Sequence, residues 1–238
     1  MRIEKFDSLE STNKYCEALD LAQVEDFTCF WALEQTAGIG QRNNQWESEP
    51  GKNLTFSLVL HPSFLPADQQ FKLTESLSLG VIDFLKDIKD IKVKWPNDIY
   101  VGGSKLCGTL VSTRLQGLQI ASAVCGIGLN VNQTHFPDWV PNPVSLSSLT
   151  GRTYKLESLL QKLLQCMEHR YNELKTGCDP GPEYLNHLLN LGVPAQYRYK
   201  GEEITATISG VDPYGRLLLF AADGRHLSCG MKEVTLLA

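Results

Sequence analysis

The chain of 238 residues carries a net charge of −5, with 42% hydrophobic and 21% charged residues, the balance of an ordinary soluble globular protein. This acidic balance argues against a general nucleic-acid or acidic-membrane partner, because nonspecific phosphate binding needs a basic face. The length allows one large domain, or one medium domain with a small appendage.

Cysteine usage and the N-terminus bear on the cellular compartment. The seven cysteines are an odd number, and no two are spaced as Cys-x-x-Cys, so reduced thiols fit better than a disulfide framework or a zinc site. Residues 1–7 contain no long apolar core, and no run approaches the length of a membrane span. We therefore expect a cytoplasmic protein with no membrane partner.

In chain order, the first part of the sequence alternates β-rich runs with helical patterns. Ser11 or Thr12 can cap the first helix, since a side-chain oxygen accepts from the free amides of the first turn. Strands are expected at 2–6, 28–34, 54–60, 92–94, 99–101, 106–111 and 119–131, and helices from 11 to about 22 and from 66 to about 88. Residues 35–53 and 132–143 are expected to be loops.

The character of the sequence changes near residue 192. Apolar residues at i, i+3, i+4 and i+7 spacing predict a helix over 156–174, and a short helix over 182–191 ends at Gly192. Five short β runs follow, at 195–199, 204–211, 217–220, 226–229 and 234–237. We therefore predict an α+β protein, with a main domain over 1–191 and a small β-barrel over 192–238.

The most informative stretch is Lys94-Trp95-Pro96-Asn97-Asp98, followed by Lys105-Leu106-Cys107-Gly108. Pro96 forces a turn, and the next strands bring the polar ends together. A cluster of cation, amide and carboxylate suits a phosphate-bearing ligand better than a core. Taken alone, Lys105 is more simply an edge-strand charge, but Lys94, Asn97 and Asp98 on adjacent runs weaken that interpretation.

A polar stretch from Gln35 to Trp46 is a second candidate. Gly38 and Gly40 allow the backbone to approach a ligand, and free amides beside Arg42 suit an anion. The stretch is neither a dinucleotide fingerprint nor a Walker A loop. For Trp46, stacking on a ligand and packing in the core are equally good interpretations.

Other candidates have simpler interpretations. Asn130, at the end of Gly126-Ile127-Gly128-Leu129-Asn130, either caps a turn or touches a ligand. Cys107 is better explained as a buried inert thiol, because no histidine lies near it in sequence. The five histidines show no metal-ligand spacing, so any metal ligand stays unknown.

Taken together, these segments resemble the biotin protein ligases across nearly the whole chain. The similar segments are Ser11-Thr12-Asn13, Gln35–Gly38 continuing to Trp46, Gly51–Leu54, Lys94–Asp98, Lys105–Gly108, Gly126–Asn130 and the C-terminal β region. The resemblance implies a mixed sheet with helices on one side, like the class II synthetases, followed by an SH3-like barrel. It also implies two steps: biotin attacks the α-phosphate of ATP, with Mg²⁺, to give biotinyl-5′-AMP, and a lysine of a biotin carboxyl carrier protein domain then takes the biotinyl group.

The resemblance also implies roles for individual residues. Lys105 and Arg42 would be catalytic, with cations aimed at the charge that develops on the phosphate. Biotin would be bound by Ser11, Thr12, Asn13, Gln35, Gly38, Lys105, Gly108 and Gly126. The nucleotide would be bound by Gly40, Arg42, Trp46, Lys94, Asn97 and Asn130. No enzyme side chain need become a nucleophile.

Two departures from the family loop, usually Gly-Arg-Gly-x-Arg-Gly, matter. Ile39 deletes a cation expected to hold the intermediate, and Asn43 replaces a glycine, although asparagine tolerates unusual backbone angles best among the alternatives. We predict looser retention of biotinyl-adenylate than in relatives that carry the arginine, and we expect the loop to be mobile and to close over the adenylate.

Two other functions are alternatives for this sequence. A lipoate- or octanoate-type protein ligase of the related fold is the nearest enzymatic rival, and a non-catalytic biotin-binding protein is the other. Met1 lies ten residues before Ser11, so we expect no N-terminal helix-turn-helix domain and no DNA binding. Sheet-to-sheet dimers occur in the family, and a homodimer is an alternative that the sequence leaves open.

Overall fold

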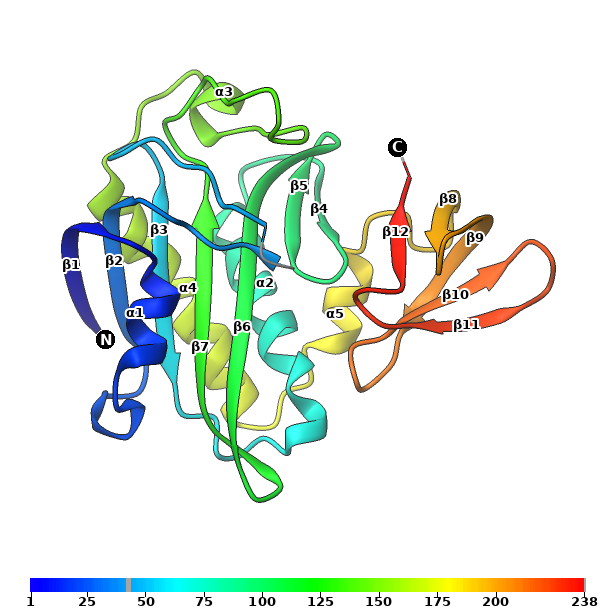
Figure 1. The fold of residues 1–238 in the computed structure, drawn as a ribbon, viewed down its shortest axis with the longest axis horizontal. Coiled ribbons are helices and arrows are strands. Elements are labelled where there is room, and N and C mark those ends of the chain that lie inside the picture. Colours follow the sequence, from blue (N-terminus) through cyan, green and yellow to red (C-terminus); the bar gives the residue numbers. More distant parts are fainter. Residues whose placement is uncertain (42–43, 238) are drawn as a thin grey trace.

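A seven-stranded mixed sheet forms the centre of the computed structural model, which describes residues 1–41 and 44–237 (Figure 1). In spatial order its strands are β1 (Arg2–Leu9), β2 (Thr28–Gln35), β3 (Leu54–Leu60), β7 (Gln119–Leu129), β6 (Ser104–Gln116), β5 (Asp98–Val101) and β4 (Ile91–Lys94). Only β1 and β2 pair in parallel; the other neighbours are antiparallel.

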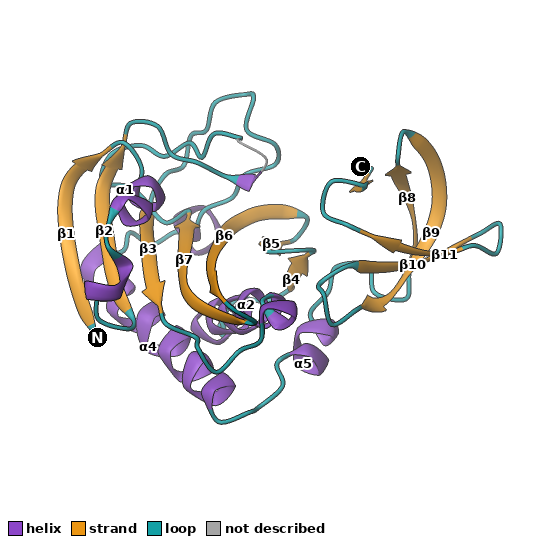
Figure 2. Cartoon of the chain, turned by 60° about the horizontal axis from the view of Figure 1, so that its bottom comes forward, coloured by secondary structure: helices purple, strands orange, loops and turns teal. Residues whose placement is uncertain are grey.

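Two long helices cover one face of this sheet, and a short one covers part of the other (Figure 2). Helices α2 (Phe71–Phe84) and α4 (Leu156–Lys175) pack closely together at Gly80. The absence of a side chain there allows this contact, because a Cβ at Gly80 would lie only 2.8 Å from Met167 Cα. Helix α1 (Thr12–Ala18) contributes Cys16 to a small apolar cluster with Phe30 and Val59 on the opposite face. The fold therefore leaves part of the α1 face open for a site.

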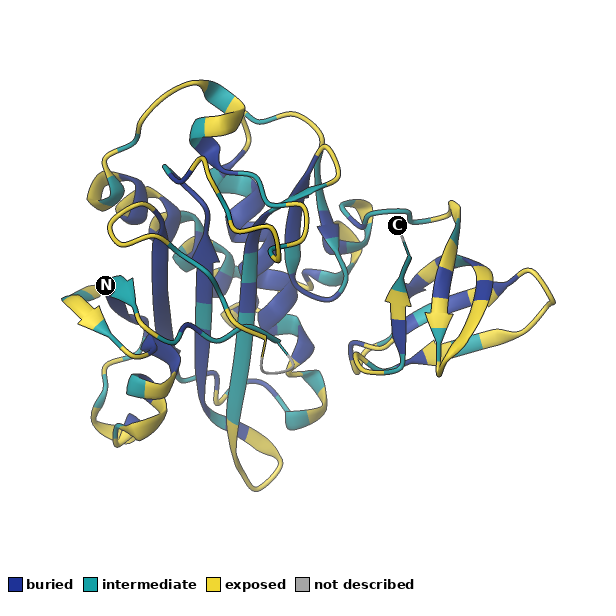
Figure 3. Cartoon of the chain, turned by 45° about the horizontal axis from the view of Figure 1, so that its top comes forward, coloured by how far each residue is buried: buried dark blue, intermediate teal, exposed yellow. Residues whose placement is uncertain are grey.

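Alternation along the central strands separates the two faces. In β7, Ala123, Cys125 and Ile127 belong to the main core beneath α2 and α4, whereas Val124 belongs to the α1 cluster. Figure 3 shows β3 as buried and β7 as mostly buried, whereas β6 is largely of intermediate exposure. Gly126 and Gly128 follow Val124 at spacing two, so both lie on the α1 face.

The C-terminal region forms a separate five-stranded antiparallel sheet. Its strands are β8 (Pro194–Tyr199), β9 (Glu202–Val211), β10 (Leu217–Ala221), β11 (His226–Cys229) and β12 (Val234–Leu236), in the order β11-β10-β9-β8-β12. Helix α5 (Gly181–Asn186) leads into it. It contacts the main sheet where the Trp95 indole Nε1 donates to the carbonyl of Gly215 at 3.1 Å.

The predicted fold class is confirmed, although over the described residues the C-terminal sheet has β11 and β12 at its edges and is not closed as a barrel. The other differences lie mostly at the ends of elements: the helix expected over 182–191 ends at Asn186, and the strand expected over 106–111 extends over Ser104–Gln116. The helix expected over 11–22 ends at Ala18, because the chain is extended at Leu19 and Asp20 before a 3₁₀ turn at Leu21–Gln23. The helix expected over 66–88 begins only at Phe71, after another 3₁₀ turn. Helix α3 (Leu146–Thr150) was not predicted; the Ser145 hydroxyl accepts from Ser148 N at 3.2 Å and caps it.

None of the helices in the described ranges is both long enough and apolar enough to cross a membrane.

Candidate active site

A cavity of about 430 Å³ lies on the α1 face of the main sheet, and the C-terminal sheet forms one of its walls. It brings together most of the residues that the sequence singled out: Ser11, Thr12, Asn13, Gln35, Gly40, Trp46, Lys94, Asn97, Lys105, Gly108 and Gly126. Tyr197 and Leu236 line it from the C-terminal sheet. Gly38 lies beside it and binds the Trp46 amide through its carbonyl at 2.9 Å. Arg42 and Asn43 lie outside the described residues.

Three glycines make the floor of this cavity. Gly108 pairs with Gly128 across β6 and β7, and Gly126 lies two residues before Gly128 on the same face. A Cβ at Gly126 would overlap the Asn13 amide, and one at Gly128 would overlap the Trp46 ring. Glycines inside strands therefore occur here because other groups approach the sheet closely.

A polar network forms one end of the cavity. Gln35 Oε1 accepts from Thr12 N at 2.7 Å and from Thr12 Oγ1 at 3.1 Å. The Ser57 hydroxyl, which sequence reasoning missed, lies 2.8 Å from Thr12 Oγ1 and 2.6 Å from Asn13 Oδ1. Among the described residues, the buried Nδ2 of Asn13 has no partner, so it is a donor suited to an acceptor atom of a ligand.

Charged groups form the other end. Lys105 Nζ lies 2.7 Å from Asp98 Oδ2 and 5.6 Å from the centre of the Trp46 ring. Lys94 Nζ donates to the Tyr100 hydroxyl at 3.4 Å. Burial lowers the pKa of Lys94; Asp98 opposes that effect and Lys105 adds to it. Two partly buried ammonium groups beside one carboxylate make a local anion site in an acidic protein.

Backbone pairing holds Lys105 in place. Lys105 N donates to Asn142 O at 2.7 Å, and Val144 N donates to Lys105 O at 2.9 Å. Asn130 Nδ2 donates to the carbonyls of Val144 at 3.0 Å and Lys105 at 3.4 Å. The Asn130 donor therefore ties the 142–144 segment to the lysine strand. Asn130 also lines the neighbouring cleft, and its role in binding the nucleotide stays a prediction.

Asn97 also makes protein contacts. Its Nδ2 donates to the carbonyl of Thr109, and Thr109 N donates to the carbonyl of Asn97 at 3.2 Å. These bonds pin the turn between β4 and β5 to β6. Asn97 nevertheless lines the cavity, next to Asp98.

A second cleft, of about 580 Å³, adjoins the first, and the Trp46 and Lys105 side chains line both. Its wall includes Phe136, Trp139 and Val140, from the loop predicted over 132–143. Sequence reasoning missed these residues; the available signal was two aromatic side chains in a proline-rich loop. An aromatic cleft beside a lysine suits a planar ring that carries an anion.

The described part of the chain shows no metal cluster, and the cysteine beside Lys105 in sequence is not an activated thiol. No three His, Cys, Asp or Glu side chains there gather as a metal site. Cys107 is buried, and its burial raises the pKa of the thiol to about 12. The interpretation of Cys107 as an inert thiol is therefore supported.

Comparison with known families agrees with this geometry. Residues 5–130 match the model of the biotin/lipoate A/B protein ligase family. The chain belongs to this family. The match runs from within β1 to the end of the Gly126–Asn130 segment, and so contains the glycine floor, Lys94–Asp98 and Lys105.

Individual members of the ligase family resemble the chain over nearly its full length. The biotin–[acetyl-CoA-carboxylase] ligase of Paracoccus denitrificans is 30% identical over 233 residues, which cover 92% of this chain and 94% of that protein. The bifunctional ligase/repressor BirA of Bacillus subtilis is 30% identical over 225 residues, covering 92% and 69%. The biotin protein ligase from Aquifex aeolicus, solved with biotin and ATP, shares the fold with a TM-score of 0.81 at 24% identity, covering 99% and 98%.

Proposed function

We propose that the protein is an ATP-dependent biotin protein ligase, which makes biotinyl-5′-AMP and transfers the biotinyl group to a lysine of a biotin carboxyl carrier protein domain. The observation that carries the proposal is the place of Lys105, whose side chain lines both the polar cavity and the aromatic cleft. A carboxylate bound on one side and a nucleotide bound on the other would meet at its ammonium group. Relatives named as biotin ligases favour biotin over lipoate.

Biotin would occupy the polar cavity. The unpartnered Nδ2 of Asn13 would bind an acceptor of the ureido ring, in a pocket formed by Ser11, Thr12 and Gln35. Gly108 and Gly126 line this cavity and let the Trp46 and Asn13 side chains approach the sheet, and the Gly38 carbonyl accepts from the Trp46 amide. This arrangement would direct the carboxylate of biotin towards Lys105.

ATP would place its base in the aromatic cleft and its phosphates at the cations. Trp46 and Trp139 offer ring faces for the base, and Lys94 and Lys105, with Arg42 and Gly40 of the loop, would bind the phosphates. Mg²⁺ would enter with the triphosphate, and the carboxylates available to it are Asp98 of the cavity and Glu47 of the cleft.

The chemistry needs fixed charge more than an enzyme nucleophile. A carboxylate oxygen of biotin forms a bond to the α-phosphorus, and the bond to the pyrophosphate oxygen breaks. Lys105 would offset the repulsion between the two anions and stabilise the charge that develops on the phosphate. The carrier amine then attacks the activated carbonyl, and AMP leaves.

The organisation of the chain fits this scheme. We assign catalysis to residues 1–191 and regard 192–238 as an appended unit, whose Tyr197 and Leu236 close one side of the cavity. A carrier domain that presents an extended lysine would enter between the two parts. We further propose a cytoplasmic location, with no role in binding DNA.

The test is biotin-dependent exchange of labelled pyrophosphate into ATP. We expect exchange with biotin and none with lipoate, followed by transfer of biotin to a purified carrier domain when that domain is added. Exchange that depends on lipoate would favour the lipoate-type ligase. Binding of biotin with no exchange would favour the non-catalytic binding protein.

A further inference from the structure

Helix α5 contacts the turn that carries the site aspartate. Tyr184 of this helix is fully buried, and its hydroxyl donates to the carbonyl of Pro96 at 2.7 Å. Its ring packs edge-on against Phe71 of α2, with the ring centroids 5.7 Å apart. Burial holds the pKa of Tyr184 well above its usual range, so the phenol stays a donor.

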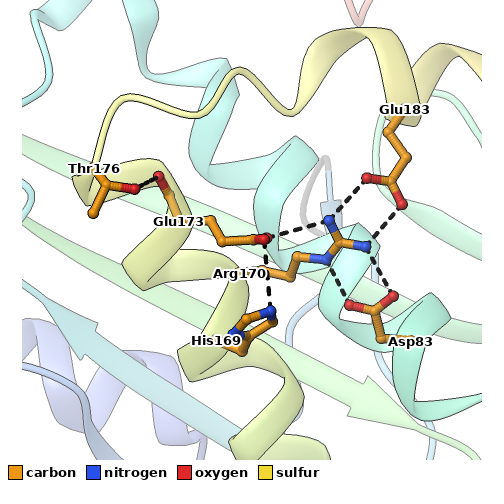
Figure 4. Close-up of polar contacts among 6 residues, drawn as sticks. All are labelled: Asp83, His169, Arg170, Glu173, Thr176 and Glu183. Atoms are coloured by element: carbon orange, nitrogen blue, oxygen red, sulfur yellow. Dashed lines mark hydrogen bonds and ion pairs between the residues drawn. The ribbon is translucent and has the colours of Figure 1, made fainter.

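An ion-pair cluster ties α5 to α2 and α4 (Figure 4). Arg170 of α4 donates to both carboxylate oxygens of Glu183 at 2.8 Å and binds Asp83 of α2 through Nε and Nη2. Two parallel hydrogen bonds from one guanidinium to one carboxylate fix the orientation of the carboxylate and also stabilise its charge. Glu183 immediately precedes Tyr184, so the cluster holds the tyrosine against the turn.

The chain that follows α5 pairs with β4. Val93 N donates to the carbonyl of His187 at 2.8 Å, and Leu189 N donates to the carbonyl of Val93 at 2.8 Å. The segment from Tyr184 to Leu189 therefore binds both the strand before the turn and the turn itself.

Two residues after Pro96, Asp98 leaves this turn and forms the 2.7 Å ion pair with Lys105. We propose that Tyr184 is a positioning residue for adenylation: its hydroxyl fixes the Pro96 carbonyl, and through the turn it fixes the carboxylate that orients Lys105. This inference rests on the proposed ligase function. The biotin pocket, built by Ser11–Asn13 and Gln35, lies on other elements.

The expected effect is a partial loss. The Trp95 indole bond to Gly215 and the Asn97 bonds to Thr109 also hold the turn, so loss of one hydroxyl loosens it without releasing it. A buried neutral hydrogen bond is consistent with a roughly tenfold effect on rate. Affinity for biotin alone should not change, which separates the proposed role from a general loss of stability.

The experiment compares Tyr184→Phe with Tyr171→Phe. Tyr171, on α4 and away from the cavity, is a matched control. It is also buried, and its hydroxyl also donates to an oxygen, Asp26 Oδ1, at 3.3 Å. For both variants we would measure kcat and KM for pyrophosphate exchange, the Kd for biotin without nucleotide, and the thermal unfolding temperature. Amide hydrogen exchange over residues 94–100 is measured without ligand.

We expect Tyr184→Phe to lower kcat about tenfold, to leave the biotin Kd within about twofold, and to speed amide exchange over 94–100; Tyr171→Phe should change none of these. An unchanged kcat, or an equal fall in both variants, would overturn the inference even where the turn exchanges faster. If the wild-type protein shows no pyrophosphate exchange, the proposed function fails, and the amide exchange still decides the inference: unchanged protection in Tyr184→Phe overturns it.

Discussion

Lys105 Nζ lies 2.7 Å from Asp98 Oδ2, and the two residues come from neighbouring antiparallel strands whose register places Asp98 opposite Gly108. Both side chains keep about a quarter of their surface exposed, at 27% and 25%. A pair this exposed adds little to stability, so its main effect is to fix the direction of the ammonium group. The cavity and the cleft meet at that group.

Replacing Asp98 with Asn tests this orientation. The amide keeps the size of the side chain but removes the charge, so Lys105 would sample more positions and the adenylation rate should fall at least about tenfold. Pre-steady-state formation of biotinyl-adenylate measures this rate. Asp87→Asn, at an exposed site outside the cavity, is the control and should leave the rate unchanged. A wild-type rate in Asp98→Asn would show that the ion pair does not orient Lys105.

The glycine floor predicts a selective loss of biotin affinity. In Gly126→Ala the new methyl group would overlap the Asn13 amide and displace it. The variant would therefore move Asn13 Nδ2, the unpartnered donor that we assign to biotin. We expect the biotin Kd, measured by calorimetry, to rise about tenfold or more, as for loss of a buried hydrogen bond together with a steric clash. In Gly210→Ala the methyl group meets only Leu218, at 3.9 Å, and the Kd should stay unchanged. Equal affinity in both variants would contradict the proposed biotin pocket.

Ile39 lines the cavity and pairs with Gln45 across the loop. An arginine there would add a cation near the phosphate of the intermediate, so Ile39→Arg should slow release of biotinyl-adenylate by about tenfold, as expected for one charge-assisted contact. A chase of labelled adenylate with unlabelled biotin and ATP measures the release rate. Ile39→Met lengthens the side chain without charge and serves as the control. An unchanged release rate in Ile39→Arg would contradict the prediction that Ile39 loosens the retention of biotinyl-adenylate.

Glu75 of α2 predicts a pH dependence of stability. Burial raises the pKa of its carboxyl from 4.5 to about 7; Asp179 adds to the rise and Lys72 opposes it. Between these two values the unfolded chain releases a proton that the folded chain keeps, so stability falls as pH rises through this window. The size is about 3 kcal/mol, since one pKa unit corresponds to about 1.4 kcal/mol.

Urea unfolding of the wild type and Glu75→Gln at pH 5 and pH 7.5 isolates this contribution, because the other titrating groups cancel in the difference. The wild type should lose stability relative to the variant at the higher pH. A difference that stays constant between the two pH values would mean that Glu75 ionises normally in the folded protein.

The sequence predicts best where neighbouring strands meet through short turns. Pro96 and the glycines 102 and 103 allow only a meander, so the gathering of Lys94, Asp98 and Lys105 follows from local signals. Ser57 was missed because its role depends on the pairing of β3 with β7, which sets Ser57 opposite Gly126 and near Asn13. A single serine in an apolar strand does not indicate which residue of the neighbouring strand it will face.

Non-local contacts explain the other differences. Asn130 had a ligand role and a local role as equal alternatives, and only the approach of the 142–144 segment shows where its donor goes. Phe136 and Trp139 lie in a loop with no periodic pattern, so nothing local placed them beside Lys105. The wall that Tyr197 contributes depends on how the C-terminal sheet contacts the turn at Trp95.

The most direct test of the account is pyrophosphate exchange in Lys105→Ala, with the exposed Lys89→Ala as the control. Since Lys105 would carry the stabilisation of developing charge where the two cavities meet, exchange should fall by roughly 10²–10³ or more, with the thermal unfolding temperature close to that of the wild type. Near-normal exchange in a folded Lys105→Ala protein would contradict the assignment of Lys105 as the centre of the site.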